Sequence, residues 1–551
     1  MALRDGLRSG DVFVPGSRRY ADPASFLLTP QAWEPQRAEF CTLVGKPASA
    51  ADALAAADEE LHTALADLET LLARGGGTGD VRLTAQGELI IPRLSAEDVP
   101  SEADALREEM AAMLPRVPFA SVLVEVDART GFLDHLVHAG GKVNRPAELK
   151  RNLVYVIVAE ATNMGLTAMA ESCGVPYDVL GWTAEWYFRA ETLDAANAAM
   201  VNYHHRLPLT QMFGPGTLSS SDGQRFPTKG KSITARSMSR YFARGQGVSV
   251  YTHVSDQHTT IDTRVIVATA PEGHYVLDGI LGNDTDLPIV EHATDTHGAS
   301  LANFALFDLV GKQLSPRIRD LGKITLYRTG PQADFVARYP HAGPLLTRRL
   351  NTELITATWD DLLRVAASVK YGHATAALVV GKLCSSKRQQ NALTTAIKEY
   401  GALRRTVYAA RYLADETYRL RIARQLNKGE NLHSLRRELA YAGEGAVRRR
   451  HHEQQSEQMW CLTLATNAIV TWTTEYYGLA VTALRRSGRD INDETLAHLW
   501  PSHHANVNFY GTHSIDVAGE LAKLDTDGYR PLRPAGAATT LLSGDNHAEH
   551  R

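Results

Sequence analysis

Residues 248–268 read VSVYTHVSDQHTTIDTRVIVA, and this stretch decides the fold class. Val248, Val250 and Val254 alternate with polar or aromatic residues, and 263–268 is rich in β-branched residues. Alternation and β-branching are typical of strands that bury one face. The stretch therefore predicts at least two neighbouring strands.

Short apolar runs separated by Gly, Asp and Pro extend this pattern in both directions. Leu, Ala, Lys and Arg dominate the sequence that follows, which has the texture of helices. The sequence therefore predicts an α/β protein. The expected strands are one ending at or just before Asp222, then 248–254, 263–268, 275–277, 287–290 and 324–327.

Composition divides the chain into seven expected segments. The first mixes basic and apolar residues like an arm, and the last lacks any periodicity, which is typical of disorder. The segments are an N-terminal arm (1–45), an acidic helical or linker segment (46–115), a helical domain (116–206), the first part of a strand-rich core (207–330), a helical insertion (331–425), the helix of Glu430 with C-terminal helices (426–520) and a disordered tail (521–551).

Charge is distributed unevenly, although the formal net charge is only −4. Residues 51–110 contain 14 Asp and Glu against 4 Lys and Arg, whereas 361–450 contain 18 Lys and Arg against 7 Asp and Glu. A basic window of this kind indicates a face that follows DNA phosphates. Solvated helix faces explain it equally well.

Nothing in the sequence indicates a membrane or a structural zinc site. The longest apolar stretch, 153–159, is far shorter than the roughly 18 residues of a membrane helix. The four cysteines form no CxxC or Cys/His cluster, which favours a reducing compartment. We therefore expect a cytoplasmic protein with no membrane partner.

Three acidic residues stand where metal chemistry would use them. Asp222 follows three serines in SSSDGQRF, and Asp295 follows the run LPIVEHAT, so its carboxylate should emerge at the C-terminal end of a strand. Glu430 lies in NKGENLHSLRR, where Leu432 and Leu435 belong to a buried stripe on another face of the expected helix. Each residue also has an ordinary interpretation.

Asp222 and Asp295 also suit turns, and Asn427 with Glu430 fits a capping box at a helix start. The metal interpretation has a chemical reason. Cleavage of a phosphodiester benefits from two Mg²⁺ ions about 3.5–4 Å apart, and Mg²⁺ prefers carboxylate oxygens. Basic residues near Glu430 suit a phosphate backbone or a solvated face: Arg424, Lys428, Arg436 and Arg437.

Other candidates rank below these three acids. Asp256 and Asp278 lie on or beside expected strands. They would either support the metal ligands from behind or lie near them by accident. No HExxH and no GxxxxGK[ST] occurs, so neither a zinc protease nor a nucleotide-binding loop is supported. The histidines near the strands are expected to be structural, except that His297 is the best candidate to touch a scissile phosphate: His253, His258, His292 and His297.

Six ordered blocks of this sequence resemble the transposases of the Tn3 family of replicative transposons. The similarity extends from about Leu3 to about Asp516, and the three acids are separated by 73 and 135 residues, as in that family. The blocks are SSSDGQRF (219–226), YTHVSDQH (251–258), HYVLDGIL (274–281), EHATDTHG (291–298), PRIRDL (316–321) and LNKGENLHSLRR (426–437).

The resemblance implies a ribonuclease H-like core with a mixed sheet and a helical insertion in the long second gap. It implies that Asp222, Asp295 and Glu430 match the family's DDE triad and bind Mg²⁺, for which Mn²⁺ may substitute. The implied activity is 3′-end cleavage and strand transfer in DNA transposition, by at least a homodimer on transposon ends and target DNA. The implied location is the bacterial cytosol, at the nucleoid.

The family pattern differs from this chain in length. Family members are usually close to twice as long, with N-terminal domains that recognise the terminal inverted repeats, so we expect this chain to correspond to their C-terminal portion. Two alternatives stay open. One is a non-catalytic remnant that binds DNA or pairs with a full-length transposase and inhibits it, and the other is a general ribonuclease H-like nuclease.

Overall fold

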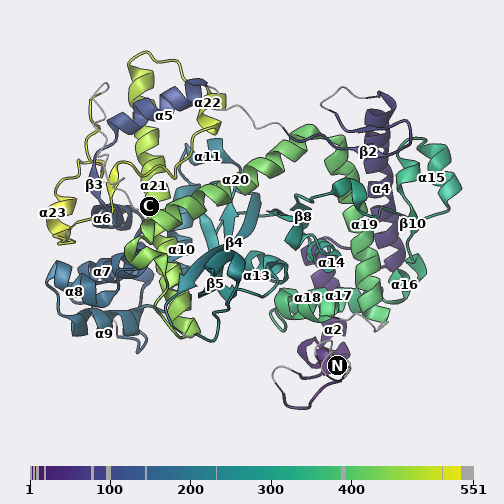
Figure 1. The fold of residues 1–551 in the computed structure, drawn as a ribbon, viewed down its shortest axis with the longest axis horizontal. Coiled ribbons are helices and arrows are strands. Elements are labelled where there is room, and N and C mark those ends of the chain that lie inside the picture. The colour runs from purple at the N-terminus through teal and green to yellow at the C-terminus, as the bar shows by residue number, and fades with distance from the viewer. Residues whose placement is uncertain are drawn as a thin grey trace.

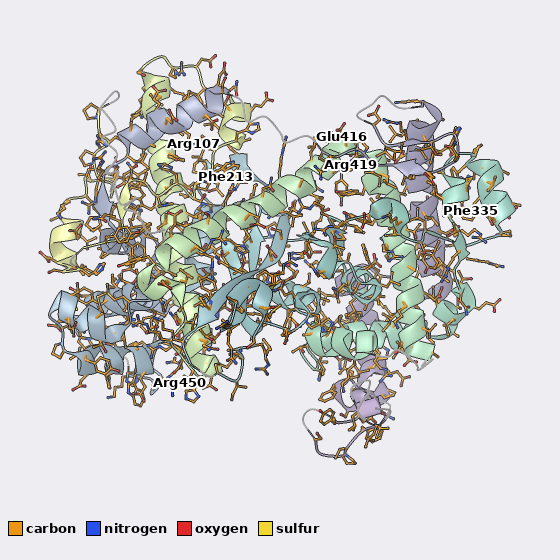
Figure 2. The ribbon with its side chains drawn as sticks, viewed as in Figure 1. Arg107, Phe213, Phe335, Glu416, Arg419 and Arg450 are labelled. Carbon is orange, nitrogen blue, oxygen red and sulfur yellow. The ribbon has the colours of Figure 1, made fainter. Side chains whose placement is uncertain are left out.

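The computed structural model describes residues 3, 6–7, 12–17, 20–75, 80–94, 101–142, 145–230, 232–385, 392–511 and 513–534. Two helical lobes flank a central sheet, and the long helix α20 (Glu416–Leu439) crosses in front of the sheet from one lobe to the other (Figure 1). Figure 2 shows Glu416 and Arg419 near the start of α20 and Phe213 on the side of the opposite lobe.

The sheet has five strands in the order β6-β5-β4-β7-β8. Strands β4, β5 and β6 pair antiparallel, whereas β4, β7 and β8 pair parallel, so the sheet is mixed. The expected α/β architecture is thereby confirmed. The strands are β4 (Leu218–Thr228), β5 (Gln246–Ser255), β6 (Thr260–Val267), β7 (Glu291–Thr294) and β8 (Gln313–Pro316).

Two expected strands are wrong. The run at 275–277 lies at the start of helix α13 (Val276–Leu281), and 287–290 belongs to no strand, because pairing with β4 begins only at Glu291. Apolar runs this short do not distinguish a strand from a buried helical turn. A short hairpin around Gly87 pairs β1 (Arg82–Leu83) with β2 (Leu89–Ile90). The other short pairs are β3 (Val117–Pro118) with β11 (Val507–Asn508), and β9 (Tyr327–Arg328) with β10 (Arg348–Arg349).

The first lobe packs on one face of the sheet. Its centre is α21, a helix of 35 residues whose middle is almost entirely buried, and Val248 and Val250 of β5 share its apolar core. The helices of this lobe are α5 (Ser101–Met113), α6 (Phe119–Thr130), α7 (Leu149–Ala161), α8 (Leu166–Cys173), α9 (Tyr177–Tyr187), α10 (Ala190–His205), α11 (Thr210–Phe213), α21 (His452–Arg486), α22 (Asp493–Ala497) and α23 (Val517–Leu521).

The second lobe is built on α4, α14 and α19. Tyr251 and Ile266 of the sheet share its apolar core with the leucine stripe of α4. Its helices are α2 (Pro30–Trp33), α3 (Arg37–Val44), α4 (Ala50–Ala73), α14 (Leu301–Leu309), α15 (Gln332–Arg338), α16 (Thr352–Ala357), α17 (Trp359–Lys370), α18 (Ala376–Ser385) and α19 (Ala392–Ala414).

Part of the charge asymmetry is internal. Glu60 of the acidic window accepts hydrogen bonds from Arg404 and Arg411 of the basic window, at 3.0 and 3.1 Å. Arg421 pairs with Glu291 of β7. Several cations of the basic window therefore stabilise contacts between helices and the sheet, and only some of them face solvent.

The expected disordered tail is wrong for its described part. Arg530 pairs with the fully buried Glu125 and with Glu520, and Arg129 lies over the ring of Tyr529. These contacts hold residues 525–534 on the first lobe. Residues 535–551 lie outside the described residues. Among those described, no helix is both long enough and apolar enough to cross a membrane.

Candidate metal centre

Strands β4 and β7 bring Asp222 and Asp295 to the same level of the sheet. Ser220 pairs with Ala293 between these parallel strands, and each aspartate lies two residues further along its chain. Asp295 directly follows β7, as expected for the carboxyl end of a strand. Asp222 differs from the expectation, because it lies in the middle of β4, opposite Thr252 of β5, and not in a turn.

Side-chain alternation along β4 decides which face Asp222 occupies. Ser219 and Ser221 point to one face, where both accept or donate hydrogen bonds with His292 at 2.8 Å. Ser220 points to the other face, where it contacts Gln425 of α20. Because side chains alternate in a strand, Asp222 faces α20 together with Ser220.

Helix α20 carries Glu430 to this face. Glu430 lies well inside the helix, which begins after Asp415, whose carboxylate caps it by accepting from Tyr418 N. The capping-box interpretation of Glu430 is therefore wrong. The expected stripe of Leu432, Leu435 and Leu439 is buried, while Glu430 is exposed, so packing and the free carboxylate occupy different faces of the helix.

A group of possible metal ligands forms where β4 and α20 meet. Ligand atoms of Asp222, Glu430 and His433 all lie within 4.8 Å of one another. His433 Nδ1 is 3.8 Å from Asp222 Oδ2, and its Nε2 is 3.3 Å from Thr252 Oγ1. Asp295 stands beside this group and binds His297 Nδ1 at 2.5 Å.

The electrostatics of the group favour a bound cation. Burial, together with repulsion from Glu272, Glu430 and Asp295, raises the pKa of Asp222 to about 7, against a hydrogen bond from Gly223 N that lowers it. Burial lowers the pKa of His433 to about 3, so its imidazole is neutral near pH 7. Crowded acids without a nearby paired cation are the usual setting of a metal site.

The donor set fits a divalent ion. Asp222, Asp295 and Glu430 offer carboxylate oxygens, which Mg²⁺ and Mn²⁺ prefer. His433 adds a neutral nitrogen, a ligand type that suits transition metals more than Mg²⁺. His433 was not predicted from the sequence, although its position three residues after Glu430 places both on one helix face.

The basic residues near Glu430 separate into two kinds. Arg436 is fully buried and donates to Thr463 Oγ1 of α21 at 2.9 Å, and Lys428 donates to the carbonyls of Phe213 and Asp256. Arg436 is therefore closed off from DNA, contrary to the expectation for it, whereas Lys428 also lines the large cleft and its contact with DNA stays a prediction. Arg424 and Arg437 are exposed, as is His297.

The competing acids have structural roles. Asp256 accepts hydrogen bonds from Gly216 N and Leu218 N, where β4 begins. Asp278 accepts from Ala376 N and Ala377 N at the start of α18. Their lower rank is consistent with these contacts. His253 bonds to the carbonyl of Val276, His292 to the two serines of β4, and His258 packs edge-on against Phe213.

A cleft of about 1620 Å³ is lined by Asp295 and His297 and by residues of α20. It reaches from Asp295 and His297 along α20 to the β1–β2 hairpin and to Trp500 beyond α22. Exposed cations that line it include Arg93, Arg317, Arg319, Lys323 and Arg424.

Comparison with known proteins places the chain in a family. Residues 121–513 match the Tn3 transposase DDE domain, which is more than half of the chain. The chain belongs to the Tn3 transposase family. It is 37% identical over 539 residues to the transposase for transposon Tn501 of Pseudomonas aeruginosa. The alignment covers 97% of this chain and 53% of that protein.

Two further Tn3 family relatives have the same relation to the chain. The transposase for transposon Tn3926 of Escherichia coli is 38% identical over 543 residues, and the transposase for transposon gamma-delta of Escherichia coli (strain K12) is 34% identical over 528 residues. The chain covers 53% and 52% of these proteins. It thus spans about half the length of the curated relatives that it matches.

Proposed function

We propose that this chain is the catalytic portion of a replicative DNA transposase with a ribonuclease H-like core. It cleaves the phosphodiester at each transposon 3′ end and joins the freed 3′-hydroxyl to target DNA, with Mg²⁺ as cofactor and Mn²⁺ as a substitute. It acts in the bacterial cytosol on nucleoid DNA, as at least a homodimer, because two ends must be joined. The grouping of Asp222, Glu430 and His433 where β4 meets α20, with Asp295 at the end of the adjacent strand β7, supports this proposal.

Asp222, Asp295 and Glu430 would hold the divalent ions through their carboxylate oxygens. When bound, such ions activate a nucleophilic water or 3′-hydroxyl and neutralise the charge on the departing oxygen. The rigid strand β4 and the packed helix α20 fix two of the acids before any ion binds. Preorganised carboxylates avoid the cost of ordering them at the moment of reaction.

His297 is suited to contact the scissile phosphate. Its side chain is 81% exposed, and its hydrogen bond and charge interaction with Asp295 raise the pKa of the imidazole, a shift toward the cationic form. A cationic imidazole beside the acids attracts a phosphate that the carboxylates alone would repel. The cations that line the cleft, among them Arg317 and Arg319, continue this attraction along a DNA strand.

The test compares two glutamates of α20. Glu430→Gln should leave DNA binding largely intact and abolish Mg²⁺- or Mn²⁺-dependent nicking of a supercoiled plasmid. Glu416→Gln, an exposed glutamate in the first turn of the same helix, should nick like the wild type. Retained nicking by Glu430→Gln would refute the assignment.

The same preparation decides between this proposal and its rivals. Joining of a labelled 3′-ended DNA to a target is expected for a transposase, whereas cleavage without joining indicates a general nuclease. A remnant would neither nick nor join, and would inhibit transposition when mixed with a full-length family member. Either rival result contradicts the proposed activity.

A further inference from the structure

A fourth carboxylate lies behind the metal centre. Glu272 opens the short turn η4 (Glu272–His274) between β6 and α13, and its side chain is 16% exposed. Among the acids that repel the charge of Asp222, Glu272 has a larger effect on the pKa than Glu430 or Asp295. Its carboxylate accepts from Arg225 and Ser249, and it is not one of the residues whose ligand atoms lie within 4.8 Å of one another.

Glu272 occupies the space where the residue after Asp222 would carry a side chain. A Cβ atom built on Gly223 would lie 2.1 Å from Glu272 Oε1 and 2.6 Å from Oε2. The backbone N–H of Gly223 in turn donates to Asp222 Oδ1 at 2.7 Å. The carboxylate of Glu272 therefore borders the peptide group that orients the central acid.

Two side chains of the sheet hold Glu272 through one oxygen. Ser249 donates to Oε1 at 2.8 Å, and Arg225 donates to the same atom. Oε2 has no hydrogen-bond donor among the residues that the structure describes. Arg225 and Ser249 therefore fix the carboxylate beside Gly223.

The same turn also fixes the second aspartate. A Cβ atom on Gly273 would lie 2.3 Å from the carbonyl oxygen of His297, so η4 packs directly on the turn that follows Asp295. Asn303 clamps the two turns by donating to the carbonyls of Gly273 and Gly298, at 2.7 and 2.9 Å. Residues 272–273 thus contact the backbone beside both aspartates.

We propose that Glu272 is a positioning residue of the metal centre, which fixes the backbone beside Asp222 and Asp295 and adds negative charge behind them, so that a divalent cation binds more tightly. The inference rests on the proposed function, because it assumes the same metal site. Residues that support ligands from behind typically change metal affinity by roughly 10–100-fold when they are replaced.

Calorimetric titration of the whole chain with Mn²⁺ tests this role without relying on activity. Glu272→Gln keeps the size of the side chain and one acceptor oxygen for Ser249, but removes the charge. We expect its Mn²⁺ affinity to fall by roughly 10–100-fold. Loss of the ion pair with Arg225 also lowers the unfolding midpoint in EDTA, so both proteins are titrated at a temperature at which each is fully folded.

The matched control is Glu291→Gln. Glu291 is also a largely buried glutamate of this sheet region, paired with Arg421 and bonded to Ser315 Oγ at 2.6 Å, but it lies at the far end of β7. Its replacement should leave Mn²⁺ affinity unchanged. Equal affinity of Glu272→Gln and the wild type would overturn the inference alone. The wild type should bind Mn²⁺, and Asp222→Asn should abolish that binding. If either result fails, the proposed function is overturned as well.

A second pair of variants tests the contact itself. Gly223→Ala should lower the unfolding midpoint, because the methyl group meets the Glu272 carboxylate. Adding Glu272→Ala removes that carboxylate, so the double variant should unfold at a higher temperature than Gly223→Ala alone. A double variant that is no more stable than Gly223→Ala would show that Glu272 does not occupy this space.

Discussion

Asp222→Asn should stabilise the metal-free protein at pH 8. Burial and neighbouring acids raise the pKa of Asp222 to about 7, against 3.8 for an ordinary aspartate. Each tenfold change in acidity corresponds to about 1.4 kcal/mol, so the full effect would be about 4 kcal/mol. Because the Asp222 side chain is 39% exposed, solvent screening reduces this to roughly 2 kcal/mol.

The sign of the effect depends on pH. The unfolded chain loses the proton of Asp222 near pH 4, whereas the folded protein keeps it until about pH 7, so the wild type loses stability as pH rises through this window. Asparagine carries no proton to lose. The advantage of Asp222→Asn should therefore be absent below pH 4 and complete above pH 7.

Thermal unfolding in EDTA is recorded from pH 4 to pH 8. The quantity compared is the midpoint of the first cooperative transition in Asp222→Asn and in the wild type. Asp67→Asn, at an exposed position on α4, is the control and should show no pH-dependent difference from the wild type. Added Mg²⁺ should raise the midpoint of the wild type but not that of Asp222→Asn. A variant that is no more stable than the wild type at pH 8 would refute the crowding of charges at this site.

Three further changes test other parts of the structure. Arg530→Gln should lower the free energy of unfolding by about 3–5 kcal/mol in urea, because the buried Glu125 loses its cation; a loss below about 1 kcal/mol would mean that residues after α23 add little. Arg317→Ala with Arg319→Ala should weaken DNA binding and flatten its salt dependence by roughly 1–2 in log–log slope, and an unchanged slope would exclude the cleft as the DNA path. His433→Ala should weaken Mn²⁺ binding more than Mg²⁺ binding in calorimetry, and an equal effect on both ions would contradict a nitrogen ligand.

Two strands of the central sheet and the positions of Asp295 and Glu430 follow from local sequence, whereas that of Asp222 does not. Alternation in β5 and β-branched residues in β6 predict their strands, because burial of one sheet face leaves a period of two. The leucine stripe of α20 likewise predicts that Glu430 lies apart from the packed face. These features depend on residues close together in the chain.

Local signals mislead where a distant partner decides the structure. Asp222 and the glycine that follows it suit a turn, yet both lie in β4. The Glu272 carboxylate fills the position that a side chain at Gly223 would take. Arg436 is read as a surface cation, although its partner Thr463 lies on α21. Arg530 belongs to a segment without periodicity, and its order comes from Glu125, about four hundred residues earlier. No local pattern contains these contacts.

Anomalous scattering from Mn²⁺ in crystals would locate the bound ion. We predict Mn²⁺ bonded to Asp222 and to at least one of Asp295 and Glu430, at about 2.1 Å, where β4 meets α20. Mn²⁺ bound elsewhere, or no Mn²⁺ at these carboxylates at saturating concentration, would contradict it.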